Sequence, residues 1–319
     1  MEVNQQRGRP RWLLGFGFHH QLAYASAAIL IFCWVGGMLT STVVPQARWI
    51  ILGTVFVIAG ISPLPIYLQQ RKKTYWFDAV MTVLWALFLF GLLHFPIDVA
   101  ARLGARIPLR DSALALLDQK AGVHVPALVA WASHHWIGHF ANRSYGWLGW
   151  MLAAAVLVPI LTGNVKHARQ FLIANVVAFA IGLPLFIAIP AVGPWYGFHF
   201  APDAGQALCQ SAYVGMRTAQ FYAYRGDAGV VCFPSFHVVW AILCAQALWG
   251  LRPLRIPIAA LSGLIVLSTL TTGWHYFCDV LAGIAIAAVS IAISGRLLGA
   301  DVPAASRETV PEKELATHG

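Results

Sequence analysis

The chain has 319 residues, of which 59% are hydrophobic and only 10% are charged. A soluble domain carries about 25% charged residues, so this composition excludes an ordinary soluble fold and predicts an all-α integral membrane protein. The low charge, together with 28 glycines and 13 tryptophans, also excludes a disordered chain and a collagen-like one.

Several apolar runs are long enough to cross a bilayer as helices, which takes about 20 residues each. They predict about eight transmembrane helices, at 22–42, 49–68, 76–97, 147–163, 170–190, 236–250, 256–273 and 277–298. Two long polar stretches, 98–146 and 191–235, interrupt the series, and the short polar tail 300–319 follows it.

The basic residues indicate how these helices are oriented. With the N-terminus inside, 13 of the 21 lysines and arginines fall in short inside segments and 8 in much longer outside ones. Because basic residues hold loops on the cytoplasmic side, we expect cytoplasmic termini and extracytoplasmic polar stretches. Membrane orientation then explains the net charge of +9 without a nucleic-acid partner. A compact chain rich in Trp and Ala favours the bacterial inner membrane.

The outside stretches contain material for short helices. Residues 109–120 alternate apolar and polar side chains with helical spacing, and residues 125–140 are rich in Trp and His. Both patterns are typical of helices that lie at a membrane surface. Pro159, Pro184 and Pro190 fall within or near the ends of predicted spans, where they indicate kinks or broken helix ends close to a cavity.

An imidazole and a carboxylate stand at the start of the last predicted span. His275 and Asp279 are four residues apart, a spacing that puts both side chains on one face of a helix. A carboxylate beside an imidazole can hold its Nδ1–H and leave Nε2 as a nucleophile or a base. The alternative is a polar pair that only caps the span.

A second polar element, Cys232–His237, stands at the outer end of the sixth predicted span. Ser235 has the sequence context of a helix N-cap, and the free N–H groups at such a helix start attract phosphate. His237 is predicted at the same outer face as His275 and Asp279. Two imidazoles and a carboxylate beside a helix start suit phosphoryl transfer through a covalent intermediate. The alternative is a capped helix with an interfacial histidine.

These residues resemble the motifs of a known family. Pro234-Ser235-Phe236-His237 resembles the Pro-Ser-Gly-His motif of the type-2 phosphatidic acid phosphatase superfamily. Ser268 through His275, with Asp279, resembles that family's motif of Ser-Arg, five residues, His, three residues and Asp. The Phe in place of Gly and the segment Pro190–Tyr196 are similar to the branch that contains inositol phosphorylceramide synthases and, more distantly, sphingomyelin synthases.

The resemblance implies a six-helix catalytic domain at 75–299, preceded by a segment 1–74 with two additional transmembrane helices. It implies that His275 is the nucleophile that takes the phosphoryl group and that Asp279 orients it. His237 would protonate the leaving alcohol and then activate the acceptor. The implied substrates are lipids from the bilayer, and neither a metal nor a cofactor is implied.

The chain departs from the family pattern in its cations. The superfamily's first motif, Lys, six residues and Arg-Pro, is absent, and Thr269 stands where the third motif has Arg. Arg143, Arg217 and Arg225 lie in the outside stretches and are candidates to bind the phosphate instead, unless they are ordinary solvated residues. The helix start at Ser235 is a further candidate. Few cations favour a diester substrate, and so a lipid phospho-headgroup transferase; a lipid phosphate phosphatase that uses water is the alternative.

Cys209 and Cys232 are the only cysteines in a predicted aqueous loop, and both lie in the same one. An outside loop faces an oxidising compartment in most cells. We therefore predict a disulfide between them that holds His237 against His275. Two thiols that merely share a loop are the alternative.

Two other functions fit parts of the sequence. His135 and His139 are four residues apart and close to His134, which suits zinc. However, no acid lies among them, and desaturase-like sites need several such histidine boxes. A transporter would fit eight spans with broken helices, but no internal repeat is visible and the informative residues gather at one face.

Overall fold

The computed structural model describes residues 17–40, 67, 74–218 and 232–299. Within these ranges every regular element is a helix, which confirms the predicted all-α class. The elements are α1 (Phe18–Thr40), α4 (Thr74–Leu92), α5 (Phe95–Leu103), η2 (Gly104–Arg106), α6 (Asp111–Lys120), α7 (Val125–His134), α8 (Trp136–Tyr145), α9 (Leu148–Leu161), α10 (Val165–Ala188), α11 (Pro194–Gly197), α12 (Ala204–Arg217), α13 (Phe236–Leu248), η3 (Arg252–Leu254), α14 (Arg255–Thr271) and α15 (Phe277–Gly299).

Several of these helices are suited to a membrane. In the described ranges, five segments are long and apolar enough to cross one: Phe18–Leu39, Tyr75–Arg106, Val165–Ala188, Arg252–Thr271 and Phe277–Gly299. The pair α8 and α9 makes a sixth if it is one span bent by 51°. These segments correspond to six of the eight predicted spans. The span predicted at 49–68 lies outside the described residues, apart from Tyr67.

The sixth predicted span, 236–250, is present as α13 but is too short to cross a bilayer alone. Its 13 residues give a length of about 20 Å, whereas the hydrocarbon core of a bilayer is about 30 Å thick. α13 packs against α9, α10, α14 and α15. Because longer helices surround it, the start of α13 can hold polar groups inside the bundle.

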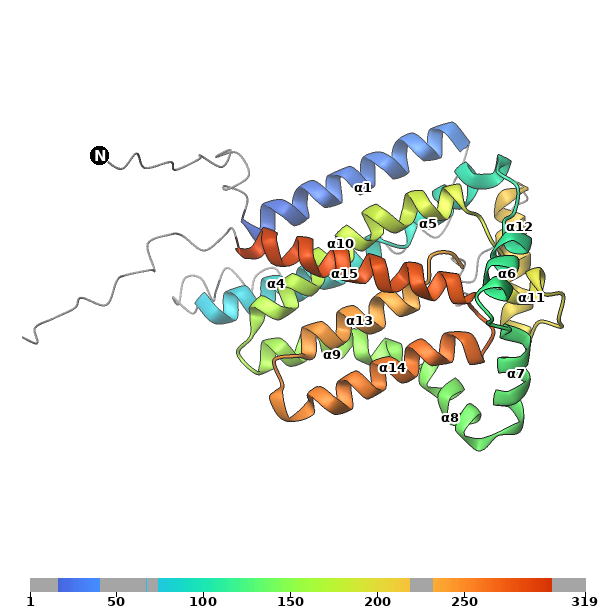
Figure 1. Ribbon diagram of the computed structural model, residues 1–319. Coiled ribbons are helices and arrows are strands. Elements are labelled where there is room, and N and C mark those ends of the chain that lie inside the picture. The colour runs from blue at the N-terminus through green and yellow to red at the C-terminus, as the bar shows by residue number, and fades with distance from the viewer. Residues whose placement is uncertain (1–16, 41–66, 68–73, 219–231, 300–319) are drawn as a thin grey trace, which may run out of the picture.

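One end of the bundle gathers the starts of α1, α4 and α10 and the end of α15 (Figure 1). Arg169 of α10 forms an ion pair of 2.7 Å with Asp78 of α4. Its guanidinium carbon also lies 4.8 Å from the ring centroid of Phe18 of α1. Gln170 of α10 donates to the carbonyl oxygen of Ile291 on α15 at 3.5 Å. The first described helix therefore begins, and the last one ends, at the same end of the bundle.

The short helices gather at the opposite end, where α10 ends and where α13 and α15 begin (Figure 1). Helices predicted at 109–120 and 125–140 are confirmed as α6 and as α7 followed by α8. α6 packs on α11 and α15, α7 packs on α8 and α14, and α12 packs on α5. These helices cover the polar starts of α13 and α15.

The prolines break the helices less than the sequence predicts. Pro159 and Pro184 lie inside α9 and α10, and both helices continue past them. Each proline is close to the end of its helix, so few backbone bonds follow it. Pro190 comes after the end of α10, and Pro184 lines an apolar cavity, as expected. The sharpest break, between α8 and α9, falls at a turn that begins with Gly146.

Candidate active site

The three residues of the predicted site lie together at the short-helix end. His237 is the second residue of α13, Asp279 is in the first turn of α15, and His275 precedes that helix. The ring centroids of His237 and His275 are 5.8 Å apart. Nδ1 of His275 is 3.5 Å from Oδ2 of Asp279, and both of these side chains are buried. The fold thus joins side chains from two separate segments.

His275 lies in a turn and not on the helix that carries Asp279, so the predicted placement of the two on one helical face is wrong. α14 ends at Thr271, and Gly273 has a φ of 75°, a left-handed conformation that favours glycine. After this turn, the N–H of Tyr276 donates to Oδ2 of Asp279 at 3.0 Å, beside the start of α15. The turn, rather than a helix, brings His275 to the carboxylate.

The partner of Nδ1 fixes the tautomer of His275. Nδ1 lies 3.0 Å from the carbonyl oxygen of Cys232, closer than to Asp279. A carbonyl oxygen can only accept a hydrogen bond, so Nδ1 of the neutral imidazole carries the proton and Nε2 keeps its lone pair. The sequence predicts the carboxylate in this role. In the structure, the carbonyl has it and the carboxylate is the second neighbour.

Asp279 joins the two segments of the site. Its Oδ2 accepts from the N–H of Tyr276 and, at 3.2 Å, from the thiol of Cys232. Its backbone oxygen accepts from the N–H of Ser235 at 3.3 Å. These bonds hold the chain before α13 against the chain before α15, without any contribution from the histidines.

An aromatic wall covers His237. Tyr145 of α8 stacks on its ring, with the centroids 4.1 Å apart and the planes at 17°, and the phenol oxygen lies 3.2 Å from Nδ1. Trp274 lies 6.2 Å from the Tyr145 ring in a parallel orientation, and Trp195 meets Trp274 edge to face at 5.6 Å. Such stacking fixes the imidazole and removes water from its face.

Ser235 caps α13, as the sequence predicts. Its hydroxyl oxygen accepts from the N–H of Val238 at 3.4 Å. In the described part of the chain, the N–H groups of Phe236 and His237 have no protein acceptor, as is usual in a first helical turn. These backbone groups, rather than the hydroxyl, remain available to an anion.

Arg217 does not have the predicted role at the phosphate. Its guanidinium donates to the carbonyl oxygens of Gly104, Ala105 and Ile107, at 2.8, 3.2 and 2.6 Å. Carbonyl groups at a helix end lack partners within the helix. Arg217 satisfies those of Ala105 and Ile107 and shares that of Gly104 with the N–H of Ile107. The structure therefore gives this arginine a structural function that fixes α12 to the end of α5 and η2.

The other cations predicted for the site are not found in it. Arg143 is exposed on the last turn of α8, and Arg225 lies outside the described residues. Thr269, in place of the family's Arg, is buried and donates to the carbonyl oxygen of Val266 at 2.7 Å. Within the described ranges, no lysine or arginine has a hydrogen bond, an ion pair or a ring contact with the two histidines or the carboxylate.

The predicted disulfide is wrong for this structure. Cys209, on α12, and Cys232 are both thiols, and both are buried rather than in an aqueous loop. The Cys232 thiol donates to Asp279 instead, so its sulfur is directed into the site. Burial raises the pKa of this thiol well above its ordinary value.

Two buried carboxylates support the site, and sequence reasoning missed both. Asp111, at the start of α6, accepts from the N–H groups of Val192 and Gly193, each at 2.9 Å. It also accepts from the hydroxyl of Tyr276 at 3.0 Å. Burial raises the pKa of Asp111, although these hydrogen bonds act in the opposite direction. The loop after α10 is thereby tied to the residue that follows His275.

Asp118 lies seven residues after Asp111, on the same face of α6. Its two oxygens accept from the backbone N–H groups of Phe277 and Cys278, at 2.7 and 2.9 Å, and so cap α15. Burial raises the pKa of this carboxyl as well. The signal that could have found the pair is two acids at a spacing of seven in a short helix.

The histidine-rich stretch does not form one helical face. α7 ends at His134, and α8 begins two residues later. His135 stacks on Trp131 with a centroid separation of 5.1 Å, and its Nδ1 lies 2.7 Å from the carbonyl oxygen of Trp131. Among the residues that the structure describes, one group of three could hold a metal ion: Cys232, His275 and Asp279.

Two imidazoles and a carboxylate at one end of a bundle of apolar helices define a multi-pass membrane protein with the groups that phosphoryl transfer requires. A family model described as the PAP2 superfamily matches residues 112–293, which include all three side chains. The chain belongs to the PAP2 superfamily, whose members are phosphatases and phosphotransferases, and this membership supports an enzymatic activity. No curated protein and no solved structure matches the chain.

Proposed function

We propose that the protein is a lipid phospho-headgroup transferase, similar to inositol phosphorylceramide synthases, that acts through a phosphohistidine intermediate at the extracytoplasmic face. The observation that carries the proposal is the tautomer of His275. Its Nδ1–H donates to the carbonyl of Cys232, so its Nε2 keeps a lone pair, and its ring centroid lies 5.8 Å from that of His237. An imidazole held in this state is a nucleophile.

In the first step, Nε2 of His275 attacks the phosphorus of the donor lipid, and the bond from phosphorus to the leaving alcohol oxygen breaks. The negative charge of the bound donor favours uptake of a proton from solvent by His237, and His237 gives this proton to the leaving oxygen. The imidazole of His275 becomes positively charged, and the Cys232 carbonyl and the Asp279 carboxylate stabilise this charge. The aromatic rings over His237 keep water from the intermediate.

In the second step, neutral His237 takes the proton from the hydroxyl of the acceptor. The acceptor oxygen bonds to phosphorus, and the bond to Nε2 of His275 breaks. The product is a lipid with the transferred headgroup, and both histidines return to their starting protonation states. His237 therefore serves as acid and then as base, and His275 as nucleophile and then as leaving group.

The charge of the site favours a diester over a monoester. No described lysine or arginine contacts the two histidines or the carboxylate, and Arg217 is held by backbone carbonyls. The N–H groups at the start of α13 are the anion-binding groups that remain. A phosphodiester carries less negative charge than a monoester, so it needs fewer cations.

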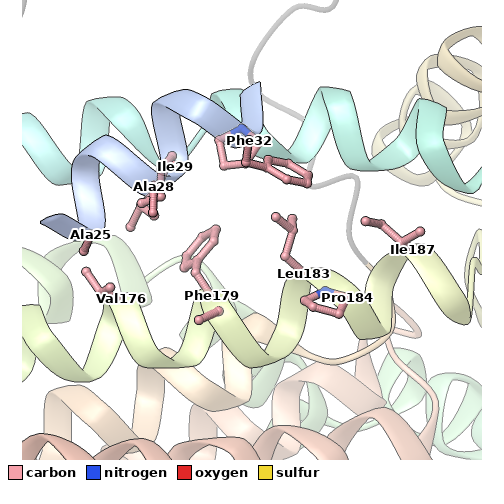
Figure 2. Close-up of a pocket in the computed structure, with 12 residues that line it drawn as sticks. Ala25, Ala28, Ile29, Phe32, Val176, Phe179, Leu183, Pro184 and Ile187 are labelled. Atoms are coloured by element: carbon pink, nitrogen blue, oxygen red, sulfur yellow. The ribbon is translucent and has the colours of Figure 1, made fainter. Parts of the chain in front are cut away.

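An apolar cavity gives the lipid tail a place beside the site. The cavity has a volume of about 310 Å³ and lies between α1, the α4–α5 region and α10, where Ala28 and Phe32 face Phe179 and Leu183 (Figure 2). All its lining residues are apolar, as in pockets that take hydrophobic ligands. Phe179 also packs on Phe236, with ring centroids 4.6 Å apart. Phe179 therefore lines the cavity and also contacts Phe236, the residue that precedes His237.

The distribution of charge supports the proposed orientation. Basic residues of the predicted cytoplasmic set lie at the end of the bundle away from the site, at the starts of α10 and α14 and at the end of α15: Lys166, Arg169, Arg252, Arg255 and Arg296. Basic residues at one end of a bundle favour its placement on the cytoplasmic side. The histidines would then face the other side of the membrane.

The proposal is tested with purified protein and a donor lipid labelled in the phosphate. His237→Ala and His275→Ala should each lower turnover at least about a hundredfold. With a donor whose leaving alcohol departs without a proton, His237→Ala should accumulate label as acid-labile phosphohistidine, because only the second step then lacks its catalyst. His275→Ala should not. His139→Ala is the matched control, since this exposed histidine lies at the same end outside the site. Near-normal turnover of His275→Ala would exclude the nucleophile.

The acceptor distinguishes the transferase from a phosphatase. Lipid mass spectrometry of a host with and without the protein should show a new headgroup lipid that depends on His275. Release of the phosphorylated headgroup into water, without a new lipid, would make water the acceptor and the protein a hydrolase.

A further inference from the structure

We infer that Cys232, His275 and Asp279 form a binding site for a soft divalent cation such as zinc, and that the bound metal blocks the nucleophile. A sulfur, a ring nitrogen and a carboxylate oxygen of these residues all lie within 4.8 Å of one another. All three residues are buried, with at most 4% of each exposed. The resemblance to a metal-independent family gives no reason to expect a metal site. Cys232 supplies the third ligand that makes one possible beside His275 and Asp279.

Two of the three ligand distances suit a tetrahedral ion, and the third, between the sulfur and the ring nitrogen, is at most 4.8 Å. Sγ of Cys232 and Nδ1 of His275 lie 3.2 and 3.5 Å from the same oxygen of Asp279. Zinc binds sulfur at about 2.3 Å and nitrogen or oxygen at about 2.0–2.2 Å, so its ligands in a tetrahedron lie about 3.3–3.6 Å apart. Three protein ligands leave a fourth position for water or an oxygen of a phosphate.

Metal binding and catalysis require different forms of His275. In the structure, Nδ1 lies 3.0 Å from the carbonyl oxygen of Cys232 and so carries the proton. A metal on Nδ1 needs the lone pair of that nitrogen, so the proton moves from Nδ1 to Nε2. The thiol of Cys232 loses its proton to solvent and binds as thiolate. With a proton on Nε2, His275 has no lone pair to offer phosphorus.

Metal binding and inhibition by the metal depend on different assumptions about the site. Binding of the metal rests on the three side chains alone and is independent of any activity. Inhibition rests on the proposed function, because it requires His275 to be the nucleophile. An experiment on binding and one on turnover therefore fail separately.

Binding is tested by adding cobalt(II), as a spectroscopic substitute for zinc, to the purified full-length protein. We expect a thiolate-to-cobalt charge-transfer band and the intense visible bands of a tetrahedral ion, at one equivalent per chain. Cys232→Ala should abolish the charge-transfer band. Cys244→Ala is the matched control, since this cysteine is equally buried in the middle of α13, and it should leave the spectrum unchanged.

The spectra also give the results that would overturn the site. Absence of a charge-transfer band in the wild type, or its survival in Cys232→Ala, would exclude it. Asp279→Asn gives a further test, because the amide is a weaker ligand and the bands should shift or weaken. An unchanged spectrum in that variant would remove the carboxylate from the group.

Inhibition is tested by titrating zinc against turnover, with magnesium as a hard cation that prefers oxygen ligands. Zinc should inhibit reversibly, with activity restored by a chelator, and magnesium should not. Each variant is compared with its own metal-free rate, and Cys232→Ala should raise the half-inhibitory zinc concentration more than about tenfold. Equal zinc sensitivity of Cys232→Ala and wild type would exclude this route of inhibition. A cobalt site without zinc inhibition would exclude His275 as the nucleophile, while the metal site would stand.

Discussion

Replacement of Asp118 by asparagine tests whether α6 positions the site from a distance. Asp118 touches neither histidine, but its two oxygens accept from Phe277 and Cys278 at 2.7 and 2.9 Å. Asparagine keeps one acceptor and presents an NH₂ group to the other backbone N–H. A backbone N–H left without its acceptor costs about 1–3 kcal/mol. This loss falls on the first two residues of α15, between His275 and Asp279.

We expect Asp118→Asn to lower both the thermal midpoint and kcat, with little change in KM. A misplacement of about 1 Å can cost about a hundredfold in rate, so a loss in kcat of at least about tenfold is expected from a smaller shift. Asp78→Asn is the control. Its half-exposed ion pair with Arg169 lies at the other end of the bundle, is worth about 0–1 kcal/mol, and should not affect kcat.

The measurement is steady-state turnover of detergent-purified protein at a temperature at which every variant is folded. A kcat of Asp118→Asn within about twofold of the wild type would refute the positioning function, even if the protein were less stable. An equal fall in kcat for Asp78→Asn would show that any loss of stability has this effect.

The same variant has a defined pH signature. Burial raises the folded-state pKa of Asp118 above the unfolded value, so its contribution to stability is present below the unfolded pKa. That contribution is lost as the pH rises through the folded pKa. The asparagine side chain of the variant cannot titrate, and the stability difference between wild type and Asp118→Asn should therefore narrow as the pH rises. A difference that widens with pH would contradict the assignment.

Three further predictions follow from the fold. Arg217→Ala should destabilise the protein, since the carbonyls of Ala105 and Ile107 lose the donor that Arg217 gives them and the carbonyl of Gly104 keeps only the N–H of Ile107. It should not raise KM selectively for the phosphate group, and a KM effect without loss of stability would assign Arg217 to the site. Ala180→Trp should fill the apolar cavity and raise KM for long-chain donors but not for short-chain donors. Val289→Trp, on an exposed surface, should leave both KM values unchanged, and equal effects of Ala180→Trp on both chain lengths would exclude a binding site for the tail. In intact cells, the cysteine of an Ala204→Cys variant, at the short-helix end, should react with an impermeant thiol reagent, and that of a Lys166→Cys variant should not. The reverse pattern would place the site in the cytoplasm.

Features of the fold that depend on residues adjacent in the sequence were predictable. The length and apolar character of the long helices are local properties, and so is the cap at Ser235, which the structure confirms. The two histidines and Asp279 were identified because each belongs to a short motif. The two imidazole rings lie 5.8 Å apart, centroid to centroid, because α13 and α15 both begin at the same end of the bundle.

The partner of His275 could not be predicted, because it is a backbone carbonyl. Every residue has one, so no residue type marks the position that will accept from Nδ1. The acceptor at Cys232 is 43 residues away in sequence, and only the packing of two turns brings it near. The same limit explains why the prediction of a disulfide was wrong. A cysteine in a polar stretch of sequence gives no sign that its thiol will be buried against Asp279.

The arginines show a second limit, which bears on the substrate. A guanidinium can satisfy an anion or the unpaired carbonyls of a helix end, because both are acceptors. The choice for Arg217 depends on a contact with Gly104, 113 residues away in sequence, so a count of outside arginines overestimates the cations that reach a phosphate. With Arg217 held elsewhere and Arg143 exposed, the N–H groups of Phe236 and His237 at the start of α13 remain as donors for the proposed phosphate. Backbone donors add no net charge, and a substrate with a single negative charge suits them better than one with two.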